Sequence, residues 1–359
     1  MPGSSAIFAV DGDSEALHLC RLGLAALGHR AALPPQLVVR PPGSAALRRV
    51  ALGEEAAGPT VVGRVGPGSL RVAAYRDGPV ALALDGAIPD GPRLRAELLE
   101  QGLLLGEEGD GEWILQTMAA SDQRTFVNRL VDALSRLEAG FALVAVDSHR
   151  MVACRDPWGL RPLCLGRWKA GFLVASEGAA IHAMGGEWLR ELLPGEMLIL
   201  EEGRLEAIRP LPRRHRRACS VEILRLGRSE STIAELEVYA ARTRLGECLA
   251  RQHPCRADVV VPLPGAEPAA LAFARRLGIP MEMPFRPGAD RYVSARSLVA
   301  GRRVALVDLA MVRERPVHAA VRSLRASGAA EVHVRIGGPV VIAPCLYGVT
   351  LESEGRWEA

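Results

Sequence analysis

The stretch C-R-D-P-W-G-L-R-P-L-C-L-G at 154–166 decides the interpretation of the first half of the chain. Short apolar runs lie on both sides of it and within its end. They predict strands at 141–146, 163–165, 172–175 and 197–200.

Outward from this stretch, the chain alternates between sheet and helix. A strand is predicted at 6–10 and a helix at 16–27, followed by β structure with loops across 32–84. Apolar residues three and four positions apart predict helices at 92–101 and 123–139. Together these segments predict an α+β layered domain.

The second half follows a different pattern, in which helices and strands alternate regularly. Helices are predicted at 233–252, 267–277 and 317–327, and strands at 258–263, 304–308 and 331–336. Such alternation is typical of right-handed βαβ units around a parallel sheet. Ligands bind such sheets beyond the carboxyl ends of the strands, so the loops at 262–267 and 308–316 are the candidate binding loops.

Between the halves lies the basic stretch R-P-L-P-R-R-H-R-R at 209–217. We interpret it as a solvated linker, with an anionic ligand site as the open alternative. The predicted division is 1–208 for the first domain, 209–218 for the linker and 219–359 for the second domain.

Composition excludes several classes of protein. Lys+Arg 44 against Asp+Glu 41 leaves a net charge of +3, too balanced for a nucleic-acid or membrane-surface binder. No apolar run reaches the length of a membrane span, and no signal peptide is evident. Seven scattered cysteines without a CxxC pair suit a reducing compartment. We therefore expect a cytoplasmic protein that binds neither nucleic acid nor membranes.

Several strings together resemble one family. The 154–166 block is followed by L-V-A-S-E at 173–177 and P-G-E at 194–196. The second half contains, in order, C-S-V-E at 219–222, V-Y-A-A-R at 238–242, R-Y-V at 291–293, A-L-V-D at 305–308, R-I-G-G-P at 335–339 and P-C-L-Y-G-V at 344–349. This series resembles amidophosphoribosyltransferase, which opens purine nucleotide biosynthesis.

The resemblance implies an N-terminal-nucleophile glutaminase of αββα layers, followed by a type I phosphoribosyltransferase domain. Members of the family hydrolyse glutamine, pass ammonia through an internal channel and attack phosphoribosyl pyrophosphate. Magnesium is the family cofactor, and a subgroup carries an iron–sulfur cluster.

The family nucleophile is an N-terminal cysteine whose own α-amine acts as base. The resemblance places Ser5 at this position, with four residues before it. A serine hydroxyl is far less ionised than a thiol. Cleavage after Ser4 would expose Ser5 as an N-terminal residue, and this alternative stays open. Cys20 lies in a helical pattern and is expected in the core.

The remaining glutamine-site positions also depart from the family pattern. Gly66 stands where an arginine would clamp the glutamine carboxylate, and Asp85 where an asparagine would donate to the oxyanion. Loss of such a donor costs roughly 3 kcal/mol in catalysis. Gly86 and Asp110 match the family, and Asp110 is a candidate ligand for an α-amine or a plain surface residue.

The ribose-phosphate loop is altered in the same way. Asp308 is retained, but Leu309 replaces a second acid, and E-R-P at 314–316 stands where the family has Gly-Thr-Thr. Proline removes one N–H donor and the glutamate adds like charge beside a phosphate. Arg313 and Arg315 are the remaining candidates for pairing with phosphate.

The pyrophosphate loop has Gly265 and Ala266 where the family has an acid and a hydroxyl, and Ala289 replaces a lysine. The long loop that closes over the substrate is also missing after Tyr292. Without such a lid the reactive intermediate would meet water.

Cys219 and Cys345 occupy the positions of two of the four cluster ligands of the iron–sulfur subgroup. The other two lie in a C-terminal extension beyond position 359. We expect two remnant cysteines and no complete cluster, with a metal bridging two subunits as the alternative. No cofactor is expected.

Three functions stay open. The first is a pseudoenzyme, a divergent and shortened paralogue that serves as a regulatory or scaffold subunit. The second is an active glutamine- or ammonia-dependent phosphoribosyltransferase with altered substrate use. The third is a protein without any ligand site. Expected partners are a second copy or an active family member, and a nucleotide is the candidate ligand.

Overall fold

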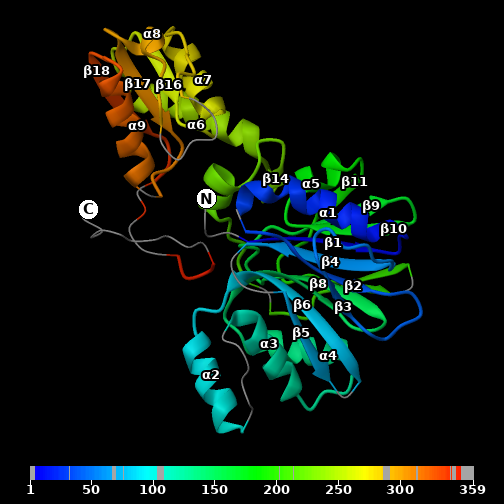
Figure 1. Ribbon diagram of the computed structural model, residues 1–359. Helices are drawn as coiled ribbons and strands as arrows, with labels where there is room; N and C mark the ends of the chain where they lie inside the picture. The colour runs from blue at the N-terminus through cyan, green and yellow to red at the C-terminus, as the bar shows by residue number, and fades with distance from the viewer. Residues whose placement is uncertain are drawn as a thin grey trace. The chain divides into compact units, whose positions relative to one another are not determined.

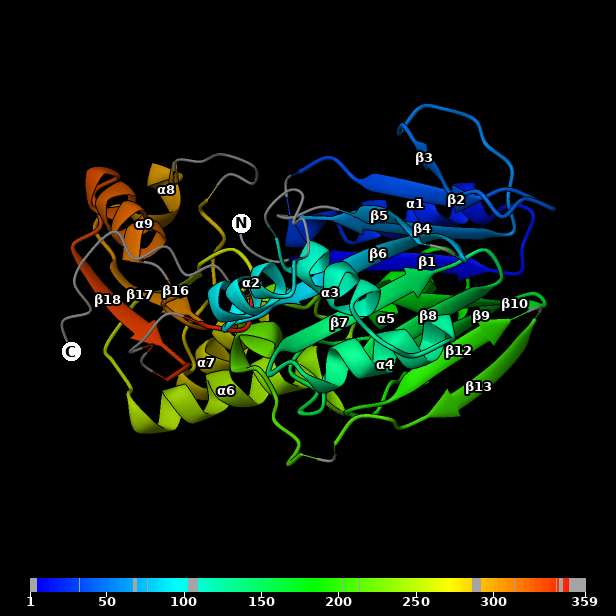
Figure 2. The same ribbon diagram turned by 90° about the horizontal axis from the view of Figure 1, so that it is seen from below.

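The chain forms two compact units in the computed structural model, shown in Figures 1 and 2. One unit comprises Met1–Cys219 with Cys345–Thr350, and the other comprises Ser220–Pro344 with Leu351–Ala359. The grouping of Cys345–Thr350 with the first unit was not foreseen from the sequence. The structure describes residues 5–31, 33–66, 70–75, 77–102, 109–201, 203–212, 214–285, 292–312, 314–339, 341 and 345–348.

The first unit contains two antiparallel sheets. The seven-stranded sheet has the order β11 (Glu187–Glu191), β9 (Cys164–Trp168), β10 (Gly171–Ala175), β1 (Ala6–Asp11), β4 (Thr60–Val65), β2 (Gln36–Arg40) and β3 (Arg48–Val50). The six-stranded sheet has the order β13 (Arg204–Ile208), β12 (Met197–Glu201), β8 (Arg150–Arg155), β7 (Gly140–Val146), β6 (Gly78–Ala87) and β5 (Arg71–Tyr75).

Helices cover the outer faces of the two sheets, which stack on one another (Figure 1). Helices α1 (Ala16–Ala26) and α5 (Gly178–Ala183) pack on the seven-stranded sheet. Helices α3 (Asp110–Ala119) and α4 (Phe126–Ser135) pack on the six-stranded sheet, and α2 (Gly91–Glu100) precedes them. This αββα layering confirms the predicted fold class.

Strand alternation builds the three cores of this unit. Phe8 of β1 points toward α1, whereas Ile7 and Ala9 point into the core between the sheets. Gly23 lets α1 approach β1 closely, because a Cβ there would lie 2.3 Å from the Phe8 ring.

The second unit contains a parallel sheet, as the sequence predicts. Its order is β16 (Val259–Pro262), β17 (Arg303–Asp308) and β18 (Glu331–Ile336). Helices α6 (Val238–Gln252) and α7 (Glu267–Leu277) pack on one face, and α8 (Arg296–Val299) and α9 (Glu314–Ala326) on the other (Figure 2). A one-turn π-helix at Glu222–Leu226 and the hairpin of β14 (Thr232–Ile233) and β15 (Leu236–Glu237) precede α6.

Three local differences from the predicted elements have physical reasons. The helix predicted from 233 begins at Val238, because Ala234 and Glu235 have φ of 54° and 66° and form the turn of the hairpin. Helix α4 begins at Phe126 because the Thr125 hydroxyl caps it, accepting from the Asn128 N–H. Helix α3 was not predicted at all. Among the described residues, no helix has the length and apolar character to cross a membrane.

Candidate functional site

Ser5 lies directly before β1 and is almost fully buried. Its Oγ accepts a hydrogen bond of 2.6 Å from Arg64 Nη2, and its carbonyl oxygen accepts one of 3.2 Å from Arg30 Nε. A guanidinium only donates hydrogen bonds and cannot take the proton of a hydroxyl. Neither arginine can therefore serve as the general base that a serine nucleophile requires.

Arg64, on β4, fills the region beside the expected glutamine clamp. Gly66 brings no side chain there, and its carbonyl oxygen accepts from Arg64 Nη1 at 3.2 Å. Arg64 Nε donates to the carbonyl oxygen of Leu84 at 2.7 Å. Burial lowers the pKa of the Arg64 guanidinium to about 10. The Arg64 side chain therefore links β4 to the end of β6 by a hydrogen bond.

Asp85, on β6, is fully buried and paired with arginine. Arg161 Nη2 donates to Asp85 Oδ1 at 2.5 Å, and Arg30 Nη2 lies 3.9 Å from Oδ2. Burial of a carboxylate is tolerated when a cation compensates it. An ionised carboxylate presents only acceptors, so Asp85 offers no donor to an oxyanion.

Glu177 extends the same cluster. Arg30 Nη1 donates to Glu177 Oε1 at 2.7 Å, and the same oxygen lies 2.9 Å from His29 Nε2. Glu177 is fully buried. We call Arg30, Arg64, Arg161, Asp85 and Glu177 the arginine network. It occupies the end of the sandwich where the resemblance implies a glutamine site.

The two positions that match the family, Gly86 and Asp110, lie at or near the end of β6. Gly86 has φ of 140°, and a Cβ there would lie 2.1 Å from the carbonyl oxygen of Gly140. A Cβ on Gly348 would lie 2.7 Å from the Gly86 Cα, so the described part of the 345–348 segment packs against this glycine. Asp110, the first residue of α3, accepts from the Ile88 N–H at 3.3 Å. Burial raises its pKa.

In the second unit, Asp308 lies at the carboxyl end of β17 and is fully buried. Arg225, from the π-helix, donates to both of its oxygens, at 2.9 Å from Nη1 and 3.3 Å from Nη2. The Leu309 N–H donates to Oδ1 at 2.8 Å. Burial raises the pKa of Asp308, and Arg225 opposes this effect. The acid that would hold ribose hydroxyls is therefore engaged within its own unit.

In the neighbouring loop after β16, a side chain of the same unit also occupies a hydrogen-bonding group. The N–H of Gly265, in the expected pyrophosphate loop, donates to Glu267 Oε1 at 3.0 Å. Leu309 is buried in the core under α6 and α7. Arg315 lies exposed in the first turn of α9, and Arg313 lies outside the described residues, as does Ala289.

The residues at this edge do not fit a magnesium ion. Asp308 is already bound to a guanidinium and the Leu309 side chain has no oxygen to offer, whereas magnesium requires several oxygen ligands. Cys219 and Cys345 are half-buried in the first unit. Within the described ranges no group of three or more potential metal ligands occurs.

An antiparallel glutaminase-type sandwich joined to a parallel phosphoribosyltransferase-type sheet defines a two-part glutamine amidotransferase fold. A family model described as a glutamine amidotransferase domain matches residues 72–183. Chloroplastic amidophosphoribosyltransferase 1 of Arabidopsis thaliana is 31% identical over 389 residues, covering 97% of this chain and 69% of the relative. The chain belongs to the amidophosphoribosyltransferase family.

A bacterial relative and its structure agree with this assignment. Amidophosphoribosyltransferase of Bacillus subtilis is 32% identical over 295 residues, covering 76% of this chain and 62% of the relative. The solved glutamine phosphoribosylpyrophosphate amidotransferase from B. subtilis, complexed with ADP and GMP, matches with a TM-score of 0.91 at 28% identity. That match covers 97% of this chain and 85% of the other.

Sequence reasoning located Ser5, Asp85 and Asp308 but missed the arginines that bind them. Arg161 lies in the 154–166 block, so its place in a dense motif was a signal that could have found it. No local pattern marks Arg30, Arg64 or Arg225 as partners of these residues.

Proposed function

We propose that this member of the amidophosphoribosyltransferase family is a pseudoenzyme that acts as a regulatory or scaffold subunit. One observation carries the proposal. The acids at the two predicted ligand sites, Asp85 and Asp308, are both buried and both bound by arginines of their own unit. Breaking such a pair to admit a ligand leaves an uncompensated buried charge.

The glutaminase half supports this proposal through its nucleophile. Ser5 is held by two cations, and the side chains that would clamp glutamine and donate to the oxyanion are replaced by Gly66 and Asp85. In the transferase half, Leu309 stands where the family has a second acid, and the Gly265 N–H already donates to Glu267. Both features support the proposal. Binding of phosphoribosyl pyrophosphate would have to displace these internal contacts.

The test measures both half-reactions with B. subtilis amidophosphoribosyltransferase as the positive control. We expect no glutamate from glutamine and no phosphoribosylamine from ammonia with phosphoribosyl pyrophosphate and magnesium. Glutamine turnover that Ser5→Ala abolishes would overturn the proposal for the first unit. Ammonia-dependent turnover would favour the altered transferase instead.

The regulatory role requires a separate measurement, because inactivity alone does not show it. The purified chain is mixed with an active family member from the same genome, and co-elution and the kinetics of the active enzyme are measured. We expect a complex with altered kinetics, in the cytoplasm. Absence of both co-elution and a kinetic effect would contradict a subunit role.

A purine nucleotide is the ligand we propose for such a subunit, because the B. subtilis relative was solved with ADP and GMP. A thermal shift with each nucleotide tests this ligand class. Unchanged melting temperatures at millimolar nucleotide would refute it.

A further inference from the structure

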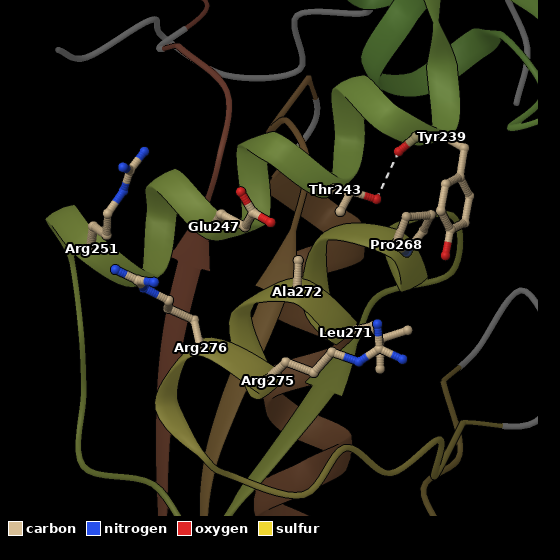
Figure 3. Close-up of a pocket in the computed structure, with 9 residues that line it drawn as sticks. All are labelled: Tyr239, Thr243, Glu247, Arg251, Pro268, Leu271, Ala272, Arg275 and Arg276. Carbon is tan, nitrogen blue, oxygen red and sulfur yellow. Dashed lines mark hydrogen bonds between the residues drawn. The ribbon is translucent and has the colours of Figure 1, made fainter.

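A hollow of about 350 Å³ lies between α6 and α7 (Figure 3). This volume lies in the range of small-molecule sites. Four charged side chains line the hollow, namely Glu247 and Arg251 of α6 and Arg275 and Arg276 of α7. Three of these four charged side chains are guanidinium groups.

Close packing of the two helices fixes the backbone positions from which these arginines extend. The two helices touch at Gly246, where a Cβ would lie 2.0 Å from the carbonyl oxygen of Ala269. Gly278 ends α7 in the left-handed conformation, with φ of 67°, and its N–H caps the last turn. Figure 3 shows Arg276 directed toward the last turn of α6, where Arg251 stands, and Arg275 directed the other way.

The charge of this region is not balanced within the described part of the chain. None of the three arginines forms an ion pair there, and Glu247 does not form one either, although it shares the hollow. Arg251 donates to the Cys248 sulfur at 3.0 Å. Helix C-termini attract cations, but each carries only about half a negative charge. Over the whole hollow, three arginines therefore exceed Glu247 and the two helix ends by about one positive charge. Arg275 contributes to this excess, although its side chain is directed away from Arg276.

We propose that Arg251 and Arg276 clamp a small polyanion that bears phosphate groups. A planar guanidinium group can donate two parallel hydrogen bonds to the oxygens of one phosphate. A ligand with several phosphates can therefore bind arginines of both helices. A single exposed ion pair is weak, so a multivalent ligand is required. The site lies at the C-terminal ends of helices that run back from the carboxyl edge of the sheet. It is therefore at the opposite edge from Asp308 and independent of the proposed function.

The test titrates the full chain with inorganic tripolyphosphate at low salt, using calorimetry. We expect Arg251→Ala/Arg276→Ala to weaken binding about tenfold or more. Arg325→Ala is the matched control, because Arg325 is an exposed arginine in the last turn of α9 of the same unit. It should leave the affinity unchanged. Glu247→Gln removes the one acid of the hollow and should tighten binding several-fold.

Other results would overturn the proposal. Equal weakening by Arg325→Ala would show non-specific attraction to basic surface. Unchanged affinity in the double variant would place the ion elsewhere, including the Asp308 edge. Weaker binding by Glu247→Gln would contradict the charge argument. Titration with citrate compares a polycarboxylate with the polyphosphate. If citrate binds as tightly as tripolyphosphate, the site does not select phosphate groups and the proposal is refuted. Circular dichroism of each variant checks that the fold is retained.

Discussion

Arg161 and Asp85, 76 positions apart in the sequence, form a fully buried ion pair with a Nη2–Oδ1 distance of 2.5 Å. The pair joins the 154–166 block to the end of β6, where the family would present an amide to a developing oxyanion. In the function that we propose, this ion pair stands where the family would have a hydrogen-bond donor.

Asp85→Asn should lower the free energy of unfolding by about 3–5 kcal/mol, because it leaves the Arg161 guanidinium buried without its counter-charge. Chemical denaturation measures the loss. The control is Asp90→Asn, which breaks an exposed ion pair with Arg93 and should have a much smaller effect. Equal effects of the two substitutions would show that the Asp85 pair is not important for stability. The new amide should not produce glutamine hydrolysis.

Arg225→Met should destabilise the second unit by about 3–5 kcal/mol, because the Asp308 carboxylate stays buried without its cation. Hydrogen exchange of the β17 amides reports this unit separately. Asp308→Asn in the same chain should recover most of the loss. The matched control is Arg303→Met. Arg303 lies on β17, as Asp308 does, and the substitution breaks an exposed ion pair with Asp258. A double variant no more stable than Arg225→Met would contradict the pairing account.

Cys20 should not react with iodoacetamide in the folded protein. Its Sγ donates to the Phe8 carbonyl oxygen at 3.2 Å, and burial raises the pKa of the thiol. Burial also raises the pKa of Cys164, to about 12. Half-exposed Cys248 should be labelled under the same conditions. Mass spectrometry of peptides after labelling measures the modification of each cysteine. Fast modification of Cys20 would contradict this prediction and would make Cys20 a candidate nucleophile.

Asp110→Asn should stabilise the protein at neutral pH, and the gain should disappear in acid. Burial raises the folded-state pKa of Asp110 above 3.8, so the folded protein disfavours the charged form despite its place at a helix N-terminus. This cost is present above the folded pKa and fades as the pH falls through it toward 3.8. Urea unfolding across this range, with Asp122→Asn as the exposed control, measures the difference. A gain that grows in acid would have the wrong sign.

Much of the fold could be predicted from local pattern. Helix α7 has the predicted bounds Glu267–Leu277, because its apolar face, its capping glycine and the flanking strands all agree. Helix α3 was not predicted, because its short apolar stretch follows a run of glycine and acidic residues that is typical of a loop. Strands β16 and β17 could be predicted because buried strands of a parallel sheet are continuous apolar runs. Strand β18 is half-buried, and the alternation of its sequence E-V-H-V-R-I marks it instead.

The candidate sites could be predicted only in part. Ser5, Asp85 and Asp308 were found as departures from a family pattern. Their partners Arg64, Arg161 and Arg225 lie 59, 76 and 83 positions away from them in the sequence. Such pairings follow from how strands and loops meet in three dimensions. A chain with 44 basic residues, nearly all arginine, offers no local sign of which one is buried.

Calorimetric titration with phosphoribosyl pyrophosphate and magnesium tests most directly whether this chain's own side chains close the proposed ligand sites. We expect no binding at sub-millimolar ligand, because the ligand must displace Arg225 from Asp308 and Glu267 from the Gly265 N–H. Binding that depends on magnesium, with a dissociation constant in the micromolar range, would contradict this expectation.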